Sequence, residues 1–275
     1  MVSLSGFVIT RDAPQLERCV RGLMACCDEV VVVDTGSSDA ERERIRTWGV
    51  RLLEVPWRGF GEARRVAVQA CSGDYCLFLD SDEYIQSSSV DAIRRLRASF
   101  NESGYRVTTN DWATTRSGRR FLFRRHSRCR VFRRSAARYE SRMIVHETPQ
   151  ITNAPLLPIE IEHDYYDGKS ASRGKRNQLY SILWAVQNSQ KLWRPPSFVK
   201  AFHWMKCLLG GGALLRGGLE SFEVAQREAN YHADKYRWLG QRSLSGAISA
   251  YEEGRIDEVF TISRALASRD SAVEV

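Results

Sequence analysis

The chain has 275 residues, of which 43% are hydrophobic, and this content supports a packed core and excludes an intrinsically disordered protein. No run of about 18 consecutive apolar residues occurs, so the sequence predicts no membrane-spanning helix. The net charge is +8, and residues 116–142 contain eleven arginines but only one acidic residue, Glu140. This segment predicts a polyanionic partner, which could be a nucleic acid, an anionic membrane or a phosphorylated small molecule.

The first hundred residues alternate strands with helices. We predict strands at residues 4–10, 29–35, 50–55 and 75–80, and helices from about residue 14, at 60–71 and at 88–100. A polar turn follows the second strand, with a helix cap at Ser38 or Asp39. Alternation with short loops predicts a parallel sheet with right-handed crossovers. Ligands of such sheets bind beyond the carboxyl ends of the strands, so we expect the polar residues that end strands one, two and four to share one rim.

Acidic side chains are concentrated at the end of the fourth strand, in Asp80-Ser81-Asp82-Glu83. Asp80 and Asp82 are two residues apart, a spacing at which paired carboxylates can bind Mg²⁺ or Mn²⁺. Such an ion would neutralise the charge of a departing diphosphate. The alternative is a polar turn in which Asp82 or Glu83 caps the next helix.

Several motifs together resemble a known family. The chain is similar to family 2 glycosyltransferases of the nucleotide-sugar-binding GT-A fold, and more narrowly to the bacterial lipopolysaccharide-core β-glucosyltransferase group. The similarity covers residues 4–150 well and residues 160–240 loosely. The matching stretches are FVITRD (7–12), EVVVVDTGSSD (29–39), WRGFGEAR (57–64), LFLDSDE (77–83), RVFRR (130–134) and VHE (145–147).

The resemblance implies a role for each matching position. The donor would be bound by Thr10, Asp12, Asp34, Arg64, Asp80 and Arg130, with Asp34 at the uracil or ribose. The metal would be bound by Asp80, Asp82 and His146, with Asp82 the better candidate for direct coordination. One departure is that the usual acid after the first strand is replaced by Ala13.

An inverting transfer needs a base that removes the proton of the acceptor hydroxyl. We expect Glu147 to be this base, with Asp111, at the end of a strand over residues 105–110, as the alternative. Glu147 could instead pair with the arginines, and His146 could be a structural histidine.

The C-terminal half differs in character. A short strand at residues 159–163 ends at His163, which could reach the rim, and the chain is helical from residue 169. We therefore expect a catalytic domain at residues 1–165 and a helical region at 166–275. Residues 197–215 suit an interfacial helix on an anionic membrane, or a helix packed on the catalytic domain or on a second subunit. Residues 241–268 predict a helical hairpin that could form a homodimer.

These features predict a metal-dependent inverting glycosyltransferase, with an α/β GT-A fold and a helical C-terminal extension. It would move a hexose from a UDP-sugar to a hydroxyl of an envelope glycan or glycolipid, such as lipopolysaccharide core. The alternatives are transfer to a peptide or protein, or a non-catalytic basic binding module; nucleic acid is not the expected partner. With no secretory signal at the N-terminus and seven cysteines outside metal-like pairs, we expect a cytoplasmic enzyme, peripheral on the inner face of the membrane.

Overall fold

The structure is a computed structural model that describes residues 2–140, 142–145, 149–167, 173–210 and 212–271. The chain forms two compact units. The first unit consists of Met1–Trp112, Arg125–Ser141 and Glu147–Tyr165, and the second of Ala113–Arg124, Arg142–His146 and Tyr166–Val275. Residues 113–124, the tip of a hairpin, therefore belong to the second unit, although they fall within residues 1–165, where we expect the catalytic domain.

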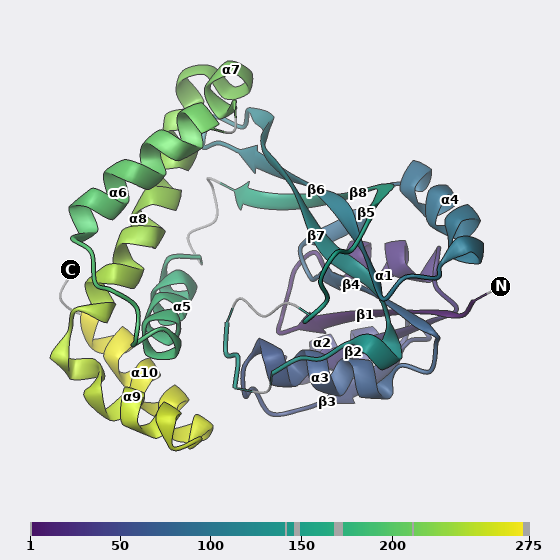
Figure 1. Cartoon of the computed structure of the whole chain (residues 1–275), viewed down its shortest axis with the longest axis horizontal. Helices are drawn as coiled ribbons and strands as arrows, with labels where there is room; N and C mark the ends of the chain where they lie inside the picture. The colour runs from purple at the N-terminus through teal and green to yellow at the C-terminus, as the bar shows by residue number, and fades with distance from the viewer. Residues whose placement is uncertain (1, 141, 146–148, 168–172, 211, 272–275) are drawn as a thin grey trace. The chain divides into compact units, whose positions relative to one another are not determined.

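Four parallel strands begin the first unit (Figure 1). They are β1 (Leu4–Thr10), β2 (Glu29–Asp34), β3 (Arg51–Glu54) and β4 (Tyr75–Asp80), adjacent in the order β3-β2-β1-β4. The predicted alternation of strands and helices is confirmed. Successive valines of β2 are buried on both faces of the sheet, as a strand covered by helices on both sides requires.

Helices cover both faces of these strands. On one face, α1 (Leu16–Met24), α2 (Asp39–Arg46) and α4 (Ser87–Leu96) contribute to a core with Val30 and Val32 of β2. On the other face, α3 (Phe60–Ala70) packs against Val31 and Val33. The alternation of side chains along one strand thus supplies two separate cores.

The sheet continues beyond β4 with antiparallel pairs, in the order β4-β7-β6-β8-β5. These strands are β5 (Glu83–Ile85), β6 (Gly104–Thr114), β7 (Arg120–Arg133) and β8 (Leu156–Asp167). Strand β5 was not predicted, because three residues give no periodicity. The arginine-rich strand β7 lies between β4 and β6, in the interior of the sheet.

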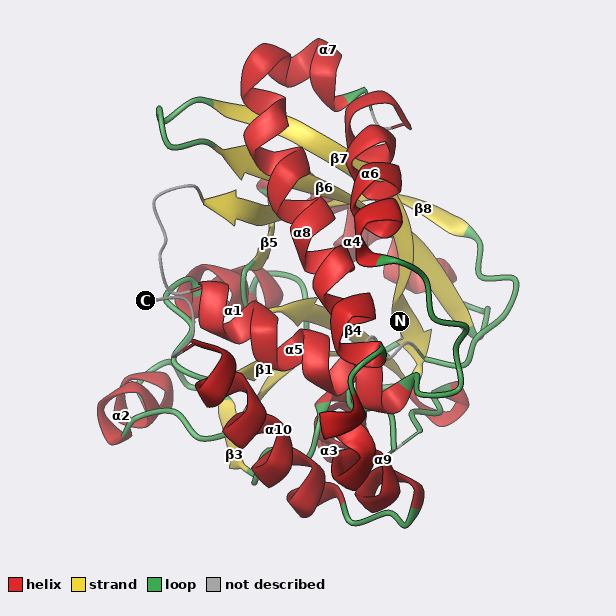
Figure 2. Cartoon of the chain, turned by 90° about the vertical axis from the view of Figure 1, so that its left-hand side faces the viewer, coloured by secondary structure: helices red, strands yellow, loops and turns green. Residues whose placement is uncertain are grey.

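The second unit is mainly helical, as predicted (Figure 2). Helix α8 packs on both α5 and α6, and α10 packs on α5 and α9. No helix in the described part of the chain is long and apolar enough to span a bilayer. The helices are α5 (Arg173–Gln187), α6 (Pro196–Met205), a π-helical turn (Lys206–Gly210), α7 (Ala213–Gly217), α8 (Ser221–Leu239), α9 (Ser245–Glu252) and α10 (Ile256–Ser271).

Candidate active site

The carboxyl ends of β1, β2 and β4 bring polar side chains to one rim. The register pairs Thr10 of β1 with Asp34 of β2, and Ile9 of β1 with Asp80 of β4. The prediction that these three strand ends meet is confirmed. Ligands of parallel sheets bind at this position, so the rim is the candidate site.

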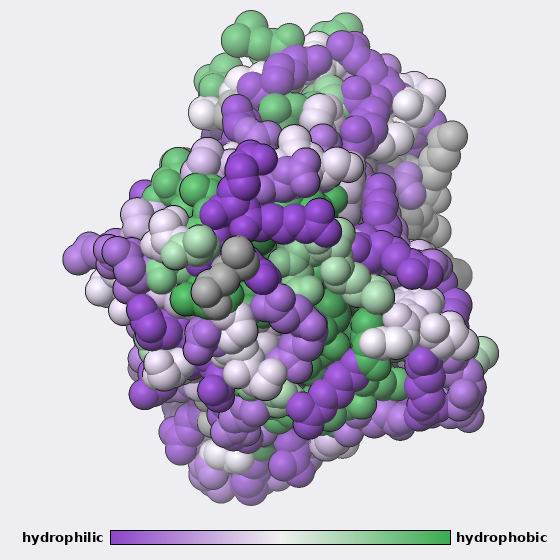
Figure 3. Space-filling view, turned by 90° about the vertical axis from the view of Figure 1, so that its right-hand side faces the viewer, coloured by the Kyte–Doolittle hydropathy of each residue, from purple (hydrophilic) through white to green (hydrophobic). Residues whose placement is uncertain are grey.

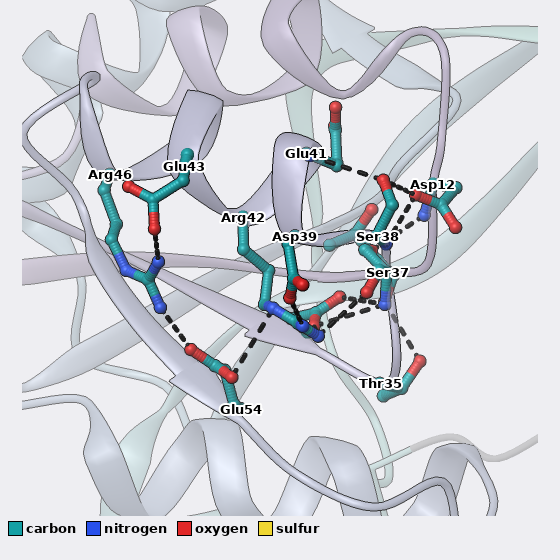
Figure 4. A network of polar contacts seen from close by, with 12 residues as sticks. Asp12, Thr35, Ser37, Ser38, Asp39, Glu41, Arg42, Glu43, Arg46 and Glu54 are labelled. Atoms are coloured by element: carbon teal, nitrogen blue, oxygen red, sulfur yellow. Dashed lines mark hydrogen bonds and ion pairs between the residues drawn. The ribbon is translucent and has the colours of Figure 1, made fainter.

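The turn after β2 is a network of hydrogen bonds and ion pairs (Figure 4), and it holds Asp34 in place. Asp34 is only 1% exposed, and its Oδ1 accepts a hydrogen bond from the backbone N–H of Ser37 at 3.0 Å. The Arg42 Nη1 lies 3.6 Å from Asp34 Oδ2. Ser38 caps α2, since its hydroxyl accepts a hydrogen bond from the backbone N–H of Glu41, and the predicted cap is confirmed. The Asp34 carboxylate is therefore fixed before any ligand arrives.

The end of β1 is bonded to the same turn (Figure 4). Asp12 adopts a left-handed backbone with φ 45°, and its N–H donates to Ser37 Oγ at 2.8 Å. Its carboxylate Oδ1 accepts from the N–H of Ser38 at 2.9 Å and from the hydroxyl of Ser38 at 3.0 Å. The Thr10 hydroxyl is buried without a hydrogen-bond partner among the described residues. An unpaired buried hydroxyl is costly, so this one is suited to a polar group of a ligand.

Two arginines hold the Asp80 carboxylate. Arg64 Nη2 donates to Oδ1 at 2.9 Å, and Arg130 Nη2 donates to Oδ2 at 3.0 Å. Both guanidinium groups lie over the Phe78 ring, 4.0 Å and 4.3 Å from its centroid. Burial raises the pKa of Asp80, but the charges of Arg130 and Arg64 outweigh it and hold that pKa below its usual value. Asp80 is therefore ionised, and both of its oxygens are engaged by protein groups.

Glu83 closes the turn that follows β4. Its Oε2 accepts the backbone N–H of Asp80 at 2.9 Å, and its Oε1 pairs with Arg130. Burial raises the pKa of Glu83 to about 7, since it outweighs the Arg130 charge, and the Asp80 carboxylate acts in the same direction as burial. The glutamate is thus part of a buried ion-pair network and does not cap a helix, because the next residues form β5.

Asp82 is in the turn between β4 and β5, with 39% of its side chain exposed. Its Oδ1 lies 3.5 Å from Nε2 of His163 on β8, and His163 Nδ1 is hydrogen-bonded to Asp111 at 2.8 Å. Burial lowers the pKa of His163, but the hydrogen bonds to Asp111 and Asp82 outweigh it and raise the pKa to about 10. The surroundings of His163 Nε2 therefore favour a positive charge.

Asp111 is fully buried between two histidines. His163 Nδ1 is bonded to its Oδ1, and His126 Nε2 lies 3.2 Å from its Oδ2. Its exposure is 0%, and its carboxylate orients the two histidines. The alternative that Asp111 is the catalytic base stays a prediction.

The other predicted site residues have different outcomes. Glu147 and His146 lie outside the described residues, so their roles stay predictions. Arg130 is 1% exposed and is bound to Asp80 and Glu83, and its contact with the donor stays a prediction. Arg64 is 6% exposed and contacts the site through Asp80.

Several arginines of residues 116–142 also bind partners within their own unit. Arg125 pairs with Glu160, and Arg124 Nη1 lies 3.6 Å from Glu228 in the second unit. Arg133 and Arg134 donate to backbone carbonyls. The excess of arginine thus has a structural use, which weakens the prediction of a polyanion bound along the whole segment.

The pairing of Asp111 with His126 and His163 could not be predicted from the sequence. Three strands supply it, β6, β7 and β8, and their register is set by tertiary packing. The alternating pattern before His163 predicted a strand that ends there, but β8 extends from Leu156 to Asp167, so the histidine is inside the strand and not at its end.

Comparison with known proteins identifies the class. The model of the family described as "Glycosyl transferase family 2" matches residues 8–155, which is more than half of the chain. The chain belongs to glycosyl transferase family 2. This membership and the observed sheet confirm the predicted GT-A fold class with its helical C-terminal region.

Two curated relatives and one solved structure illustrate the similarity. The "lipopolysaccharide core biosynthesis glycosyltransferase LpsC" of Rhizobium meliloti (strain 1021) is 28% identical over 264 residues, which span 85% of this chain and 94% of that protein. An "uncharacterized glycosyltransferase" of Rickettsia bellii (strain RML369-C) is 31% identical over 103 residues, spanning 37% of this chain and 35% of that protein. The crystal structure of S. aureus TarS 1-349 in complex with UDP is 15% identical, covers 97% of this chain and 91% of that chain, and gives a TM-score of 0.41.

Proposed function

We propose that this chain transfers a hexose, with inversion, from a UDP-sugar to a hydroxyl of an envelope glycan such as lipopolysaccharide core. The observation that carries the proposal is the similarity to LpsC, which extends over 85% of this chain and 94% of that protein. A match of this extent includes the second unit as well as the sheet. Transfer to a peptide or protein is the less favoured candidate, since the relative that matches most of the chain is described as a lipopolysaccharide core glycosyltransferase.

The nucleoside of the donor would bind at the ends of β1 and β2. The fixed Asp34 carboxylate can accept hydrogen bonds from ribose hydroxyls or from the uracil N–H. The Thr10 hydroxyl, which has no partner in the described ranges, can take up a further polar atom. Asp12 fixes the turn between them. These groups support a nucleoside pocket in which few side chains have to move.

A divalent cation, Mg²⁺ or Mn²⁺, fits the next part of the rim. Two atoms that ligate one such ion are about 3–4 Å apart, given metal–ligand distances of about 2.1 Å, and Asp82 Oδ1 and His163 Nε2 are 3.5 Å apart. Asp111 would orient His163 by accepting its other N–H, as carboxylates do behind metal-bound histidines. A carboxylate and an imidazole are a suitable donor set for Mn²⁺.

Asp82 and His163 would hold the ion, with Asp80 beside them. No three His, Cys, Asp or Glu side chains in the described ranges form a complete metal site. An ion of this kind would take its remaining ligands from substrate phosphates and water. When bound, the ion would offset negative charge on the diphosphate leaving group.

The reaction itself requires a proton acceptor beside the acceptor hydroxyl. We propose Glu147 for this role on the basis of sequence. The acceptor oxygen forms a bond to the anomeric carbon as the bond from that carbon to the UDP oxygen breaks, and the hydroxyl proton goes to the glutamate. Attack from the face opposite UDP inverts the anomeric configuration.

The compartment would be the cytoplasm. All seven cysteines are free thiols, and free thiols persist in reducing compartments.

A transfer assay tests the proposal. The purified chain would be incubated with Mn²⁺, with truncated lipopolysaccharide in detergent and with UDP-glucose, UDP-galactose or UDP-N-acetylglucosamine in turn. We expect one donor to add a single sugar, seen by mass spectrometry, with the opposite anomeric configuration by NMR. Retention of configuration, or transfer to a peptide library and not to the glycan, would contradict it.

A further inference from the structure

Helix α6 and the π-helical turn after it present an apolar face outward. Four large side chains on this face are 48–63% exposed: Phe198, Phe202, Met205 and Leu209. They recur at intervals of three or four residues, so they lie along one side of the helix. A helix on the surface of a soluble protein normally turns its polar side to water, and this one does not.

The opposite side of the same helix is only partly apolar. Val199 is buried there, but His203 and Cys207 also face inward, and the His203 ring stacks on that of His232 at 3.6 Å. Leu208 is buried as well, so the inward side combines apolar and polar side chains. Packing within the unit does not explain the two phenylalanines on the outside.

The apolar surface continues at α7 and the turn after it. Leu215 is 92% exposed and Leu219 is 83% exposed. Figure 3 shows hydrophobic residues (green) exposed among hydrophilic ones (purple) on the face that it draws. We call the six residues Phe198, Phe202, Met205, Leu209, Leu215 and Leu219 the apolar face. Exposed large apolar side chains that gather in one segment of the chain in this way indicate an interaction site.

Positive charge surrounds the apolar face. From residue 168 to residue 219 the sequence has no Asp or Glu and nine Lys or Arg. Lys200 and Lys206 are exposed beside the phenylalanines. At the other end, the exposed tip of the β6–β7 hairpin carries Arg119, whose Nη2 donates to the backbone carbonyl of Arg216 in α7. The acids nearest to this tip, Glu220 and Glu223, are bonded to the hairpin.

We propose that the apolar face is a docking surface for an anionic lipid bilayer. The apolar side chains would enter the boundary between headgroups and acyl chains, and the lysines and arginines would lie at the anionic headgroups. A second copy of the chain fits less well. A two-fold interface would place the same basic residues of both copies opposite each other, with no acid from this segment between them.

Flotation with vesicles tests this surface without any sugar donor, so its outcome is independent of the proposed transfer. The full chain would be mixed with vesicles of phosphatidylcholine alone or with 30% phosphatidylglycerol. We expect flotation only with the anionic vesicles and its loss at high salt, since surface attraction is screened. A chain that stays at the bottom of both gradients overturns the proposal.

Two double variants locate the surface. Leu215→Asn with Leu219→Asn should reduce the vesicle-bound partition about tenfold, and Phe198→Asn with Phe202→Asn should do the same, because each removes apolar area from the bilayer. The matched control is Met24→Asn with Leu156→Asn in the first unit, where both side chains are also exposed.

Circular dichroism would check that each variant is folded. Equal vesicle binding by all the variants would overturn the proposed location. Light scattering would show whether the original chain is a dimer. If it is, and if the apolar-face variants are monomers, the apolar face binds a second copy of the chain and not a lipid bilayer.

Discussion

Asp80 and Asp82 are only two residues apart, yet the structure separates their environments. Both oxygens of Asp80 are bonded to Arg64 and Arg130, whereas Asp82, which is similarly exposed, faces His163. Like charges so close together repel, and the buried arginines offset that cost for Asp80. Asp80 therefore organises the turn, and we infer that Asp82 is the acid that binds a ligand.

The buried network around Arg130 predicts a large effect on stability. Arg130→Met would leave Asp80 and Glu83 with one fewer cation in a buried position, and the free energy of unfolding should fall by about 3–5 kcal/mol. Urea denaturation followed by circular dichroism measures this.

The control for that variant is Arg125→Met on the same strand. Arg125 is about half exposed and pairs with Glu160 at the surface, so its loss should cost less than about 1 kcal/mol. If the two variants lose the same free energy of unfolding, the buried network does not stabilise the protein more than the surface pair does.

Replacing Asp111 should lower the affinity for the metal, although this residue does not contact the metal in the proposed site. Asp111→Asn keeps the shape of the side chain but weakens the orientation of His163, so Mn²⁺ affinity should fall about 10–100-fold. Electron paramagnetic resonance of free Mn²⁺ measures this directly. UDP binding without metal should be unchanged, whereas a variant that lost both would point to general disruption of the site.

At the residue scale, the sequence predicts the strand-end residues but not their partners. Thr10, Asp34 and Asp80 could be predicted together because each ends a strand with a clear apolar pattern. The engagement of Asp80 by Arg64 and Arg130 could not, since it depends on α3 packing on one face of the sheet and on β7 pairing with β4.

At the scale of elements, helix α8 contains a buried lysine. Lys235 is 3% exposed, and its ammonium group lies 4.1 Å from the Tyr231 ring centroid and 5.5 Å from that of Trp184. Burial lowers the pKa of Lys235 to about 8, against the raising effect of Glu228. The folded state therefore disfavours the charged form of this lysine.

This lowered pKa predicts how stability depends on pH. Between the folded pKa of about 8 and the unfolded value of 10.5, the unfolded chain binds the additional proton, so stability should rise with pH. The total rise from this group is at most about 3 kcal/mol. Lys235→Met should be more stable than the original chain at pH 7, with the difference shrinking towards pH 10.

Melting temperatures of both proteins at each pH would check this prediction. If the melting temperatures of the two proteins differ by the same amount from pH 7 to pH 10, the titration of Lys235 is not the cause of the difference.

Elements with regular patterns were predicted more fully than those without. The amphipathic α1 and the apolar β2 lie close to their expected bounds. The position of β7 in the sheet was harder to predict, because its arginines alternate with Phe121 and Phe123, a pattern that is typical of a strand at the surface. Its interior position depends on pairing with β4, which is distant in sequence.

At the scale of the whole molecule, the two units are not consecutive segments. The hairpin tip 113–124 belongs to the second unit, where Phe121 packs so closely on Gly217 that a Cβ there would lie 2.5 Å from the ring. Arg216 in the same unit donates to the backbone carbonyls of Leu122 and Phe123. A boundary at residue 165 therefore divides the second unit.

Truncation tests this organisation. A fragment of residues 1–165 would keep Phe121 and Phe123 but lose the helices that bury them, so it should bind a dye for exposed hydrophobic surface and aggregate. Replacing the hairpin tip in the fragment with a short glycine-serine turn should reduce dye binding. A fragment that is soluble and does not bind the dye would contradict the assignment of the hairpin to the second unit.

The central claim is that Asp82 and the ends of β1 and β2 form a metal-dependent site for a UDP-sugar. Isothermal titration of UDP into the full chain, with and without Mn²⁺, tests it most directly when Asp82→Ala and the exposed control Asp91→Ala are titrated alongside. We predict that UDP binds tightly only with Mn²⁺, that Asp82→Ala loses this binding and that Asp91→Ala retains it. UDP binding that is the same with and without Mn²⁺, or that is unchanged in Asp82→Ala, would contradict the account.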